Sequence, residues 1–172
     1  MSLLSSTVIE DIKTLCEAGQ GSMAYFYFDF RSTNKQSLRD LLPSLITQLS
    51  ARSGPRCDIL SELYSVHDNG RNQLSDGVLT KCIENMLSLP DQCPIYLIMD
   101  ALDESPITSG IPSARERVLQ LLKELVDLHL PKPHICHEPA RDRHTKCYWA
   151  SNLSPGVTSR SNWTKERYYR LC

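Results

Sequence analysis

The sequence of 172 residues has no surplus of either charge, because 19 lysines and arginines face 20 aspartates and glutamates. Proteins that hold nucleic acid by its phosphates usually carry a basic surplus, so we expect no nucleic-acid partner. No apolar run approaches the roughly 20 residues that span a bilayer, so we expect no membrane segment. The first residues carry no basic stretch of the kind that begins a secretory signal peptide. These absences favour a cytoplasmic protein.

The seven cysteines also lack the spacings that metal sites use. Their number is odd and no two of them form a C-x-x-C pair, which argues against structural zinc and against a disulfide framework. His137, His144 and Cys147 have no zinc-ligand spacing either. We therefore expect no zinc site and a reducing compartment.

Apolar periodicity divides the first 136 residues into helices and short strands. The leucines of residues 38–49 recur at helical spacing, whereas 23–30 and 95–99 are short runs dense in aromatic and aliphatic side chains. We expect helices over residues 5–16, from 34 or 37 to about 53, 57–66, 75–87 and 113–129, and strands over 23–30, 95–99 and 132–136. Strands separated by long helices need crossover connections, so the fold class is α/β with a parallel sheet covered by helices.

An acidic cluster follows the apolar run Ile95–Met99, with carboxylates at Asp100, Asp103 and Glu104. The carboxyl ends of parallel strands are where ligands bind in open α/β sheets. In P-loop nucleotide hydrolases a strand ending in acids holds Mg²⁺ and orients water. Asp100 would hold Mg²⁺ through water, and Asp103 or Glu104 would orient or deprotonate the attacking water. The alternative is that Asp100 only caps a strand-to-helix connection and the other two acids are solvated.

Four segments carry a family resemblance: LLSSTVIEDIK, MAYFYFDFRSTNKQSLRDLLPSLITQLS, PIYLIMDALDES and RERVLQLLKELVDLHLP. Residues 3–136 resemble the fungal NACHT proteins whose N-terminal region is called nephrocystin-3-like. The resemblance implies a three-layer α/β/α P-loop NTPase fold in which PIYLIMDALDES is the Walker B segment. It also implies a STAND-type signalling switch that binds ATP with Mg²⁺, usually ahead of ankyrin, tetratricopeptide or WD40 repeats.

The phosphate-binding half of that machinery is absent from the sequence. In the family, the segment matching LLSSTVIEDIK directly follows a G-x-x-x-x-G-K-[ST] loop, whose backbone N–H groups and lysine hold the phosphates. This sequence begins within the following helix, so we expect the first strand and the Walker A loop to be missing. At best Ser2 takes the place of the Mg²⁺-binding hydroxyl. We therefore expect a degenerate fragment with weak or no binding of Mg-ATP and no useful ATPase activity.

The sequence changes character after Cys136, where the family continues into a T-S-R-P-E segment and this chain reads HEPARDRH. Residues 137–172 show neither helical nor strand periodicity and predict an irregular tail. Back-translated and moved by one base, residues 137–149 and 162–172 give strings that contain SRPEIDI and GQKKDI, which resemble the family's continuation. We therefore divide the chain into a partial NACHT domain, 1–136, and an out-of-frame tail, 137–172.

Two other functions stay open. An incomplete sheet exposes an edge, so the chain is alternatively a non-catalytic module that pairs with full-length NACHT or repeat proteins. It is also conceivable as a product without a selected function. Among single features, we expect the aromatic side chains of 23–30 to be core rather than a base-stacking platform, and Asp29 and Arg31 to be solvated.

Overall fold

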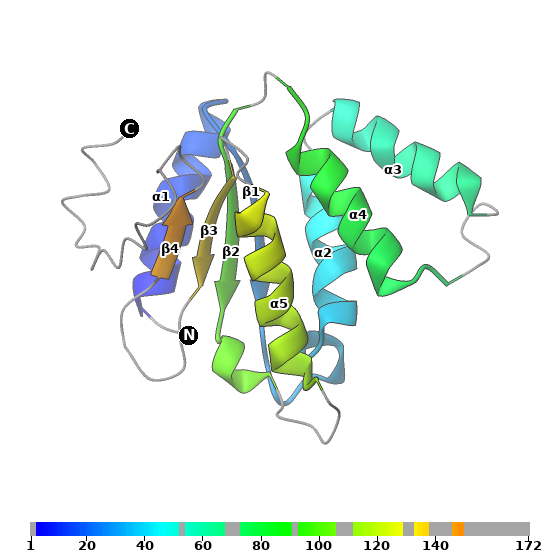
Figure 1. Ribbon diagram of the computed structural model, residues 1–172. Coiled ribbons are helices and arrows are strands. Elements are labelled where there is room, and N and C mark those ends of the chain that lie inside the picture. The colour runs from blue at the N-terminus through cyan, green and yellow to red at the C-terminus, as the bar shows by residue number, and fades with distance from the viewer. Residues whose placement is uncertain are drawn as a thin grey trace.

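The computed structural model describes residues 3–51, 54–67, 73–90, 93–105, 112–128, 133–137 and 146–149. Within these residues a sheet lies between helices (Figure 1). Its strands are β1 (Ser22–Tyr27), β2 (Ile95–Asp100), β3 (Pro133–His137) and β4 (Lys146–Trp149), in that spatial order. The first three are parallel, which confirms the predicted α/β class with a parallel sheet.

Strand β4 is an addition that the sequence pattern did not indicate. It runs antiparallel to β3 and pairs Trp149 with His134 and Lys146 with His137. Its four residues, KCYW, do not alternate between polar and apolar side chains, so periodicity does not predict a strand there. β1 also differs from the prediction, because it ends at Tyr27 and not near residue 30. The N–H of Phe28 still donates to the carbonyl of Asp100, at 3.0 Å, before the chain turns away.

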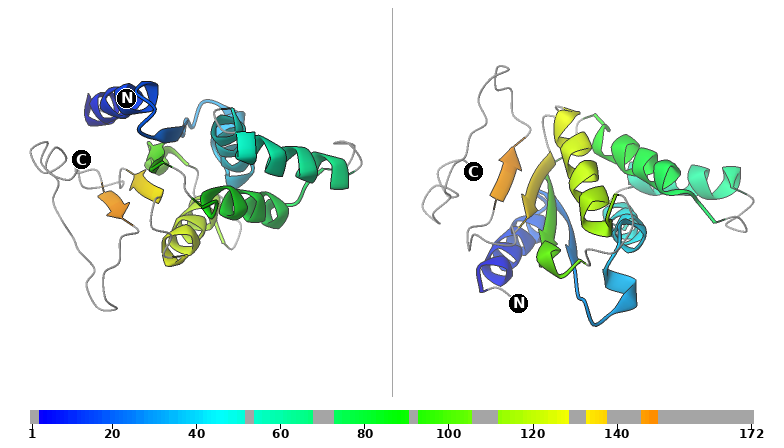
Figure 2. Two further views of the ribbon diagram at one scale, coloured as in Figure 1. Left: turned by 90° about the horizontal axis from the view of Figure 1, so that it is seen from above. Right: turned by 60° about the horizontal axis from the view of Figure 1, so that its bottom comes forward.

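The helices form two unequal layers on the sheet (Figure 2). α1 (Leu3–Glu17) covers one face, where Ile12 and Cys16 pack on Tyr96 and Ile98 of β2. α2 (Leu38–Ser50), α4 (Asp76–Leu87) and α5 (Ala114–Asp127) cover the other face and build the larger core. α3 (Gly54–Val66) packs outside α2 and α4. No helix in the described ranges is both long enough and apolar enough to cross a membrane.

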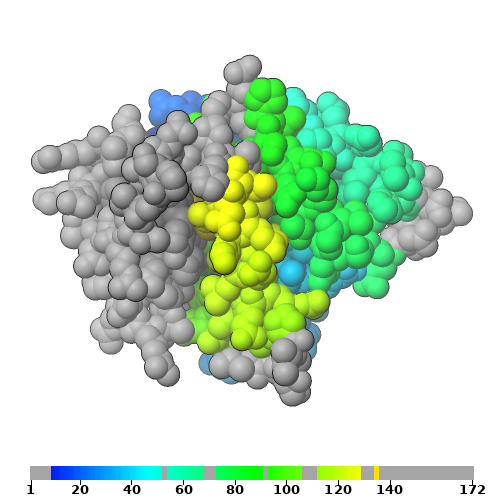
Figure 3. Space-filling model, in the orientation of Figure 1, coloured from blue at the N-terminus to red at the C-terminus, as the bar shows by residue number. Residues whose placement is uncertain are grey.

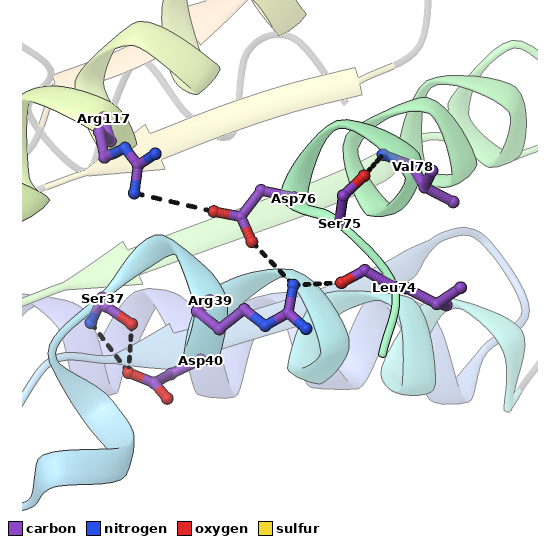
Figure 4. A network of polar contacts seen from close by, with 8 residues as sticks. All are labelled: Ser37, Arg39, Asp40, Leu74, Ser75, Asp76, Val78 and Arg117. Carbon is purple, nitrogen blue, oxygen red and sulfur yellow. Dashed lines mark hydrogen bonds and ion pairs between the residues drawn. The ribbon is translucent and has the colours of Figure 1, made fainter. Parts of the chain in front are cut away.

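The N-termini of α2, α4 and α5 are held together by polar contacts (Figure 4). Ser37 precedes α2, and its N–H and hydroxyl donate to the Asp40 carboxylate at 3.0 and 2.6 Å. Ser75 caps α4 by accepting from the N–H of Val78. Between the helices, Asp76 of α4 forms ion pairs with two guanidinium groups, and its oxygens lie 3.0 Å from Arg39 and 3.9 Å from Arg117. The contacts join the helices at the end where the parallel strands finish.

Candidate functional site at the carboxyl end of β2

Asp100 is the last residue of β2 and one of few buried charged residues in the described chain. Its exposed fraction is 4%, because β2 lies between β1 and β3 and is buried along its whole length. Its Oδ1 accepts from the N–H of Ala101 at 2.8 Å. Its Oδ2 is buried and has no hydrogen-bond partner among the described residues. A buried carboxylate oxygen without a donor is costly, so it marks a place where a cation or an ordered water fits.

Ala101, the next residue, has φ 54° and ψ 39° and is the one non-glycine residue with positive φ in the described chain. This left-handed conformation costs a residue with a Cβ about 1–2 kcal/mol. It turns the chain sharply out of the strand into the 3-10 turn η3 (Leu102–Glu104). Strained residues that persist tend to cluster at functional sites, so the strain supports a role for the turn.

The two remaining acids of the cluster lie in different surroundings. Glu104 is half-buried, and its Oε2 accepts from the N–H of Phe30 at 3.4 Å. Asp103 is exposed, and its main-chain carbonyl accepts from the guanidinium of Arg115. Arg115 also donates to the carbonyl of Ser105 at 3.0 Å, which fixes the end of η3 against α5. Of the two acids, Glu104 is therefore the one whose side chain contacts the segment that follows β1.

Tyr27 belongs to the same group of side chains, although no sequence pattern distinguishes it from the aromatic residues around it. It ends β1 and is paired in register with Asp100, so both side chains project from the same face of the sheet. Burial first, and then the negative charges of Glu104, Asp100 and Asp29, raise the pKa of the Tyr27 hydroxyl. A hydrogen bond to the Glu104 carboxylate contributes to the same shift. The hydroxyl thus stays a neutral donor facing carboxylates.

The loop after β1 closes over this group. The carbonyl of Gln36 accepts from the fully buried hydroxyl of Ser105 at 2.7 Å, and the Gln36 amide donates to the carbonyl of Phe30. Asp29 accepts from the N–H of Arg31 at 2.9 Å, so it stabilises its own turn. The Arg31 guanidinium lies over the ring of Phe30, 5.2 Å from its centroid. Of the five aromatic side chains predicted to be core, only Phe26 and Phe28 are buried. Tyr25 and Phe30 are 46% and 60% exposed, and Tyr27 is half-buried, so the prediction is wrong for these three.

The three acids do not form a metal cage. In the ranges the structure describes, no three His, Cys, Asp or Glu side chains come close enough together to hold an ion by themselves. Mg²⁺ often binds through one or two carboxylates and otherwise through water and substrate phosphates. The unpartnered Oδ2 of Asp100 fits that mode of binding. Ser2, the predicted cofactor-binding hydroxyl, lies outside the described residues.

A surface groove of about 720 Å³ lies elsewhere, between α4, α5 and the start of α2. α4 and α5 lie side by side on the face that Figure 3 shows. The charged residues that line the groove are of both signs: Asp76, Glu116, Arg117, Lys123 and Glu124. None of the sequence-predicted site residues lines it, and its charges are mixed, so the buried carboxylate at the end of β2 remains the better candidate.

Comparison with known proteins gives one finding. The sequence model of the family described as "Nephrocystin 3, N-terminal" matches residues 1–137, which includes α1 to β3 and therefore every residue of the candidate site. No curated protein and no solved structure matches the chain.

Proposed function

The chain belongs to the nephrocystin 3 N-terminal family, and from this premise we propose that the end of β2 is the acidic half of a Mg²⁺-nucleotide site. Asp100 is the Mg²⁺ residue, acting through water, as in the Walker B segment of a P-loop NTPase. Glu104 is the residue that orients water, with Tyr27 beside it. The module is a nucleotide-switch domain of the NACHT type in which this half is retained.

The unpartnered Oδ2 of Asp100 is the observation that carries the proposal. An oxygen that needed only structural satisfaction would accept from a nearby N–H, as Oδ1 does from Ala101. Instead it is left with open lone pairs at the carboxyl end of a parallel strand, the edge at which such sheets bind ligands. When bound, Mg²⁺ would neutralise phosphate charge there.

The phosphates themselves find no cradle in the printed sequence. The 172 residues contain no Gly-Lys pair, so the G-x-x-x-x-G-K-[ST] loop that supplies backbone N–H groups and a lysine is absent. The residues present can thus bind Mg²⁺, but they lack the groups that would hold the phosphates of a nucleoside triphosphate. We propose accordingly that this chain by itself binds divalent cation weakly and hydrolyses no ATP at a useful rate.

The test is a titration with Mn²⁺, a paramagnetic substitute for Mg²⁺, followed by electron paramagnetic resonance. The wild-type chain should bind Mn²⁺, Asp100→Asn should lose that binding by about tenfold or more, and Asp103→Asn should keep it. Asp103→Asn is the matched control because it removes an exposed carboxylate of the same turn. Phosphate release from Mg-ATP should stay at the background rate for all three proteins.

Two results would overturn the proposal. Equal Mn²⁺ binding by wild type and Asp100→Asn would show that Asp100 holds no cation. Steady phosphate release that Asp100→Asn abolishes would show that the chain is an active ATPase after all.

A further inference from the structure

One side chain of α5 holds the main chain of η3. The Nη2 of Arg115 donates to the carbonyl of Asp103 and, at 3.0 Å, to the carbonyl of Ser105. Carbonyl groups at the end of a helical turn lack partners within that turn, and Arg115 supplies the donor for these two. Since one carbonyl precedes Glu104 in the chain and the other follows it, the two bonds fix the backbone on both sides of Glu104.

The position of Arg115 is itself fixed by the start of its helix. Arg115 is the second residue of α5, and Ser113 and Glu116 form a capping box around it. The N–H of Ser113 donates to the Glu116 carboxylate at 2.7 Å, and the N–H of Glu116 donates to the Ser113 hydroxyl at 3.3 Å. The turn after β2 is therefore attached to a helix end with a defined backbone.

The side chain of Glu104 needs this support from its own backbone. Its Oε2 accepts from the N–H of Phe30 at 3.4 Å, which is longer than most N–H···O bonds and lies in an exposed position. A second hydrogen bond joins Glu104 to the hydroxyl of Tyr27. A flexible glutamate held only by these contacts would readily leave them, so the fixed backbone decides where the carboxylate lies.

The guanidinium of Arg115 also carries a cost. Its Nε is buried and has no hydrogen-bond partner among the described residues. A buried donor without an acceptor is destabilising, and an unbranched apolar side chain such as methionine would avoid that penalty. The cost supports a role for the two carbonyl bonds beyond the stability of the fold.

We propose that Arg115 is a positioning residue of the site at the end of β2, which fixes η3 so that the Glu104 carboxylate can orient water at the cation held by Asp100. This role rests on the proposed function, because it names the residue that sets the position of Glu104 in that site. Arg115 acts through Glu104 and not on the cation itself.

The first experiment measures Mn²⁺ affinity by electron paramagnetic resonance on the full chain. Arg115→Met keeps an apolar stem and removes both carbonyl bonds, so the Mn²⁺ dissociation constant should rise by about tenfold. Arg117→Met is the matched control, since it makes the same change two residues further along α5, and should leave the affinity unchanged. In a Glu104→Ala background, Arg115→Met should have little further effect, because the residue through which it acts is gone.

The second experiment needs no metal. The backbone amide proton of Phe30 reports the bond to Glu104 in nuclear magnetic resonance spectra. In Arg115→Met its signal should move toward the position it takes in Glu104→Ala, whereas Arg117→Met should leave it in place. Cooperative unfolding of each variant in urea shows that it is folded. In the wild type, the Nη hydrogens of Arg115 should give separate signals, because the two bonds slow rotation of the guanidinium group.

Each failure has a different meaning. A wild type that binds no Mn²⁺ overturns the proposed function, and the Phe30 amide then decides whether Arg115 positions Glu104. An unchanged Phe30 amide in a folded Arg115→Met protein would contradict the positioning role, as would averaged Nη signals in the wild type. An equal loss of Mn²⁺ affinity with and without Glu104, or an equal loss in Arg117→Met, would show that Arg115 serves only the fold.

Discussion

At the scale of single residues, the chain places two costly features next to each other. Asp100 holds a buried carboxylate oxygen without a partner, and Ala101 holds a left-handed backbone without the freedom of glycine. Either feature alone would be removed by one substitution. Their adjacency at the end of the most buried strand supports a turn shaped for a ligand rather than for stability.

Replacing Ala101 by glycine should stabilise the fold. The left-handed conformation costs alanine about 1–2 kcal/mol, and the greater backbone freedom of unfolded glycine offsets about half of that. The free energy of unfolding in urea should rise by about 0.5–1 kcal/mol. The matched control is Ala51→Gly, at a position with φ −60°, where the same change should give no increase. Equal effects of the two substitutions would contradict the strain at Ala101.

The sequence predicts that Asp100 is a site residue, but it does not predict that one of its carboxylate oxygens lacks a hydrogen-bond partner. An apolar run that ends in an acid can be recognised from the sequence, because the pattern lies within a few neighbouring residues. The lack of a partner for this oxygen cannot be predicted from the sequence, since its possible donors belong to other elements. Nor can the positive φ of Ala101, because alanine is a poor residue for that conformation. Tyr27 could not be singled out either, because it is one of several aromatic residues within MAYFYFDF.

At the scale of elements, most boundaries follow from periodicity and caps. Ser75 and Ser113 begin α4 and α5 as N-caps, and Ser37 begins α2 with Asp40. The end of β1 could not be predicted in this way, because Phe28 and Phe30 continue the aromatic run. The chain turns there through a hydrogen bond from the N–H of Asp29 to the carbonyl of Lys35. Strand pairing also sets the environment of single side chains, as β3 shows for His134.

The His134 ring, on β3, stacks on Tyr96 of β2 with centroids 5.0 Å apart. Burial lowers the pKa of His134 below its ordinary value of 6.5. Below that value the unfolded chain binds the proton more readily than the folded one, so stability should fall as pH decreases from 6.5 toward the lowered folded pKa. His134→Phe keeps the stacking and should remove this part of the pH dependence.

Urea unfolding at a series of pH values between about 5 and 7 measures this effect. His67→Phe is the control, because it removes a histidine at the end of α3 and should leave the acid-induced loss in place. A wild-type stability that is flat across this range would contradict the assigned cause, as would an unchanged slope in His134→Phe.

At the scale of the whole molecule, the parallel strands β1, β2 and β3 direct their carboxyl ends to one edge (Figure 1). There the loop after β1 and the turn after β2 are joined by Ser105 and Gln36, and the N-termini of three helices begin close by. The general position of this edge was predictable from the alternation of helices and strands. The joining of the two loops was not, because it depends on side chains far apart in the sequence.

The most direct test of the central claim is the free energy of unfolding of wild type and Asp100→Asn, measured in urea with and without millimolar MgCl₂ at constant ionic strength. Without Mg²⁺, Asp100→Asn should be more stable by about 1 kcal/mol, because it replaces a buried carboxylate that lacks a partner. Mg²⁺ should then stabilise the wild type, by about 1.4 kcal/mol at ten times its dissociation constant, and leave Asp100→Asn unchanged. Two results would contradict the assignment of Asp100 as a cation-binding residue. They are a wild type that is more stable than Asp100→Asn without Mg²⁺, and an equal stabilisation of both proteins by Mg²⁺.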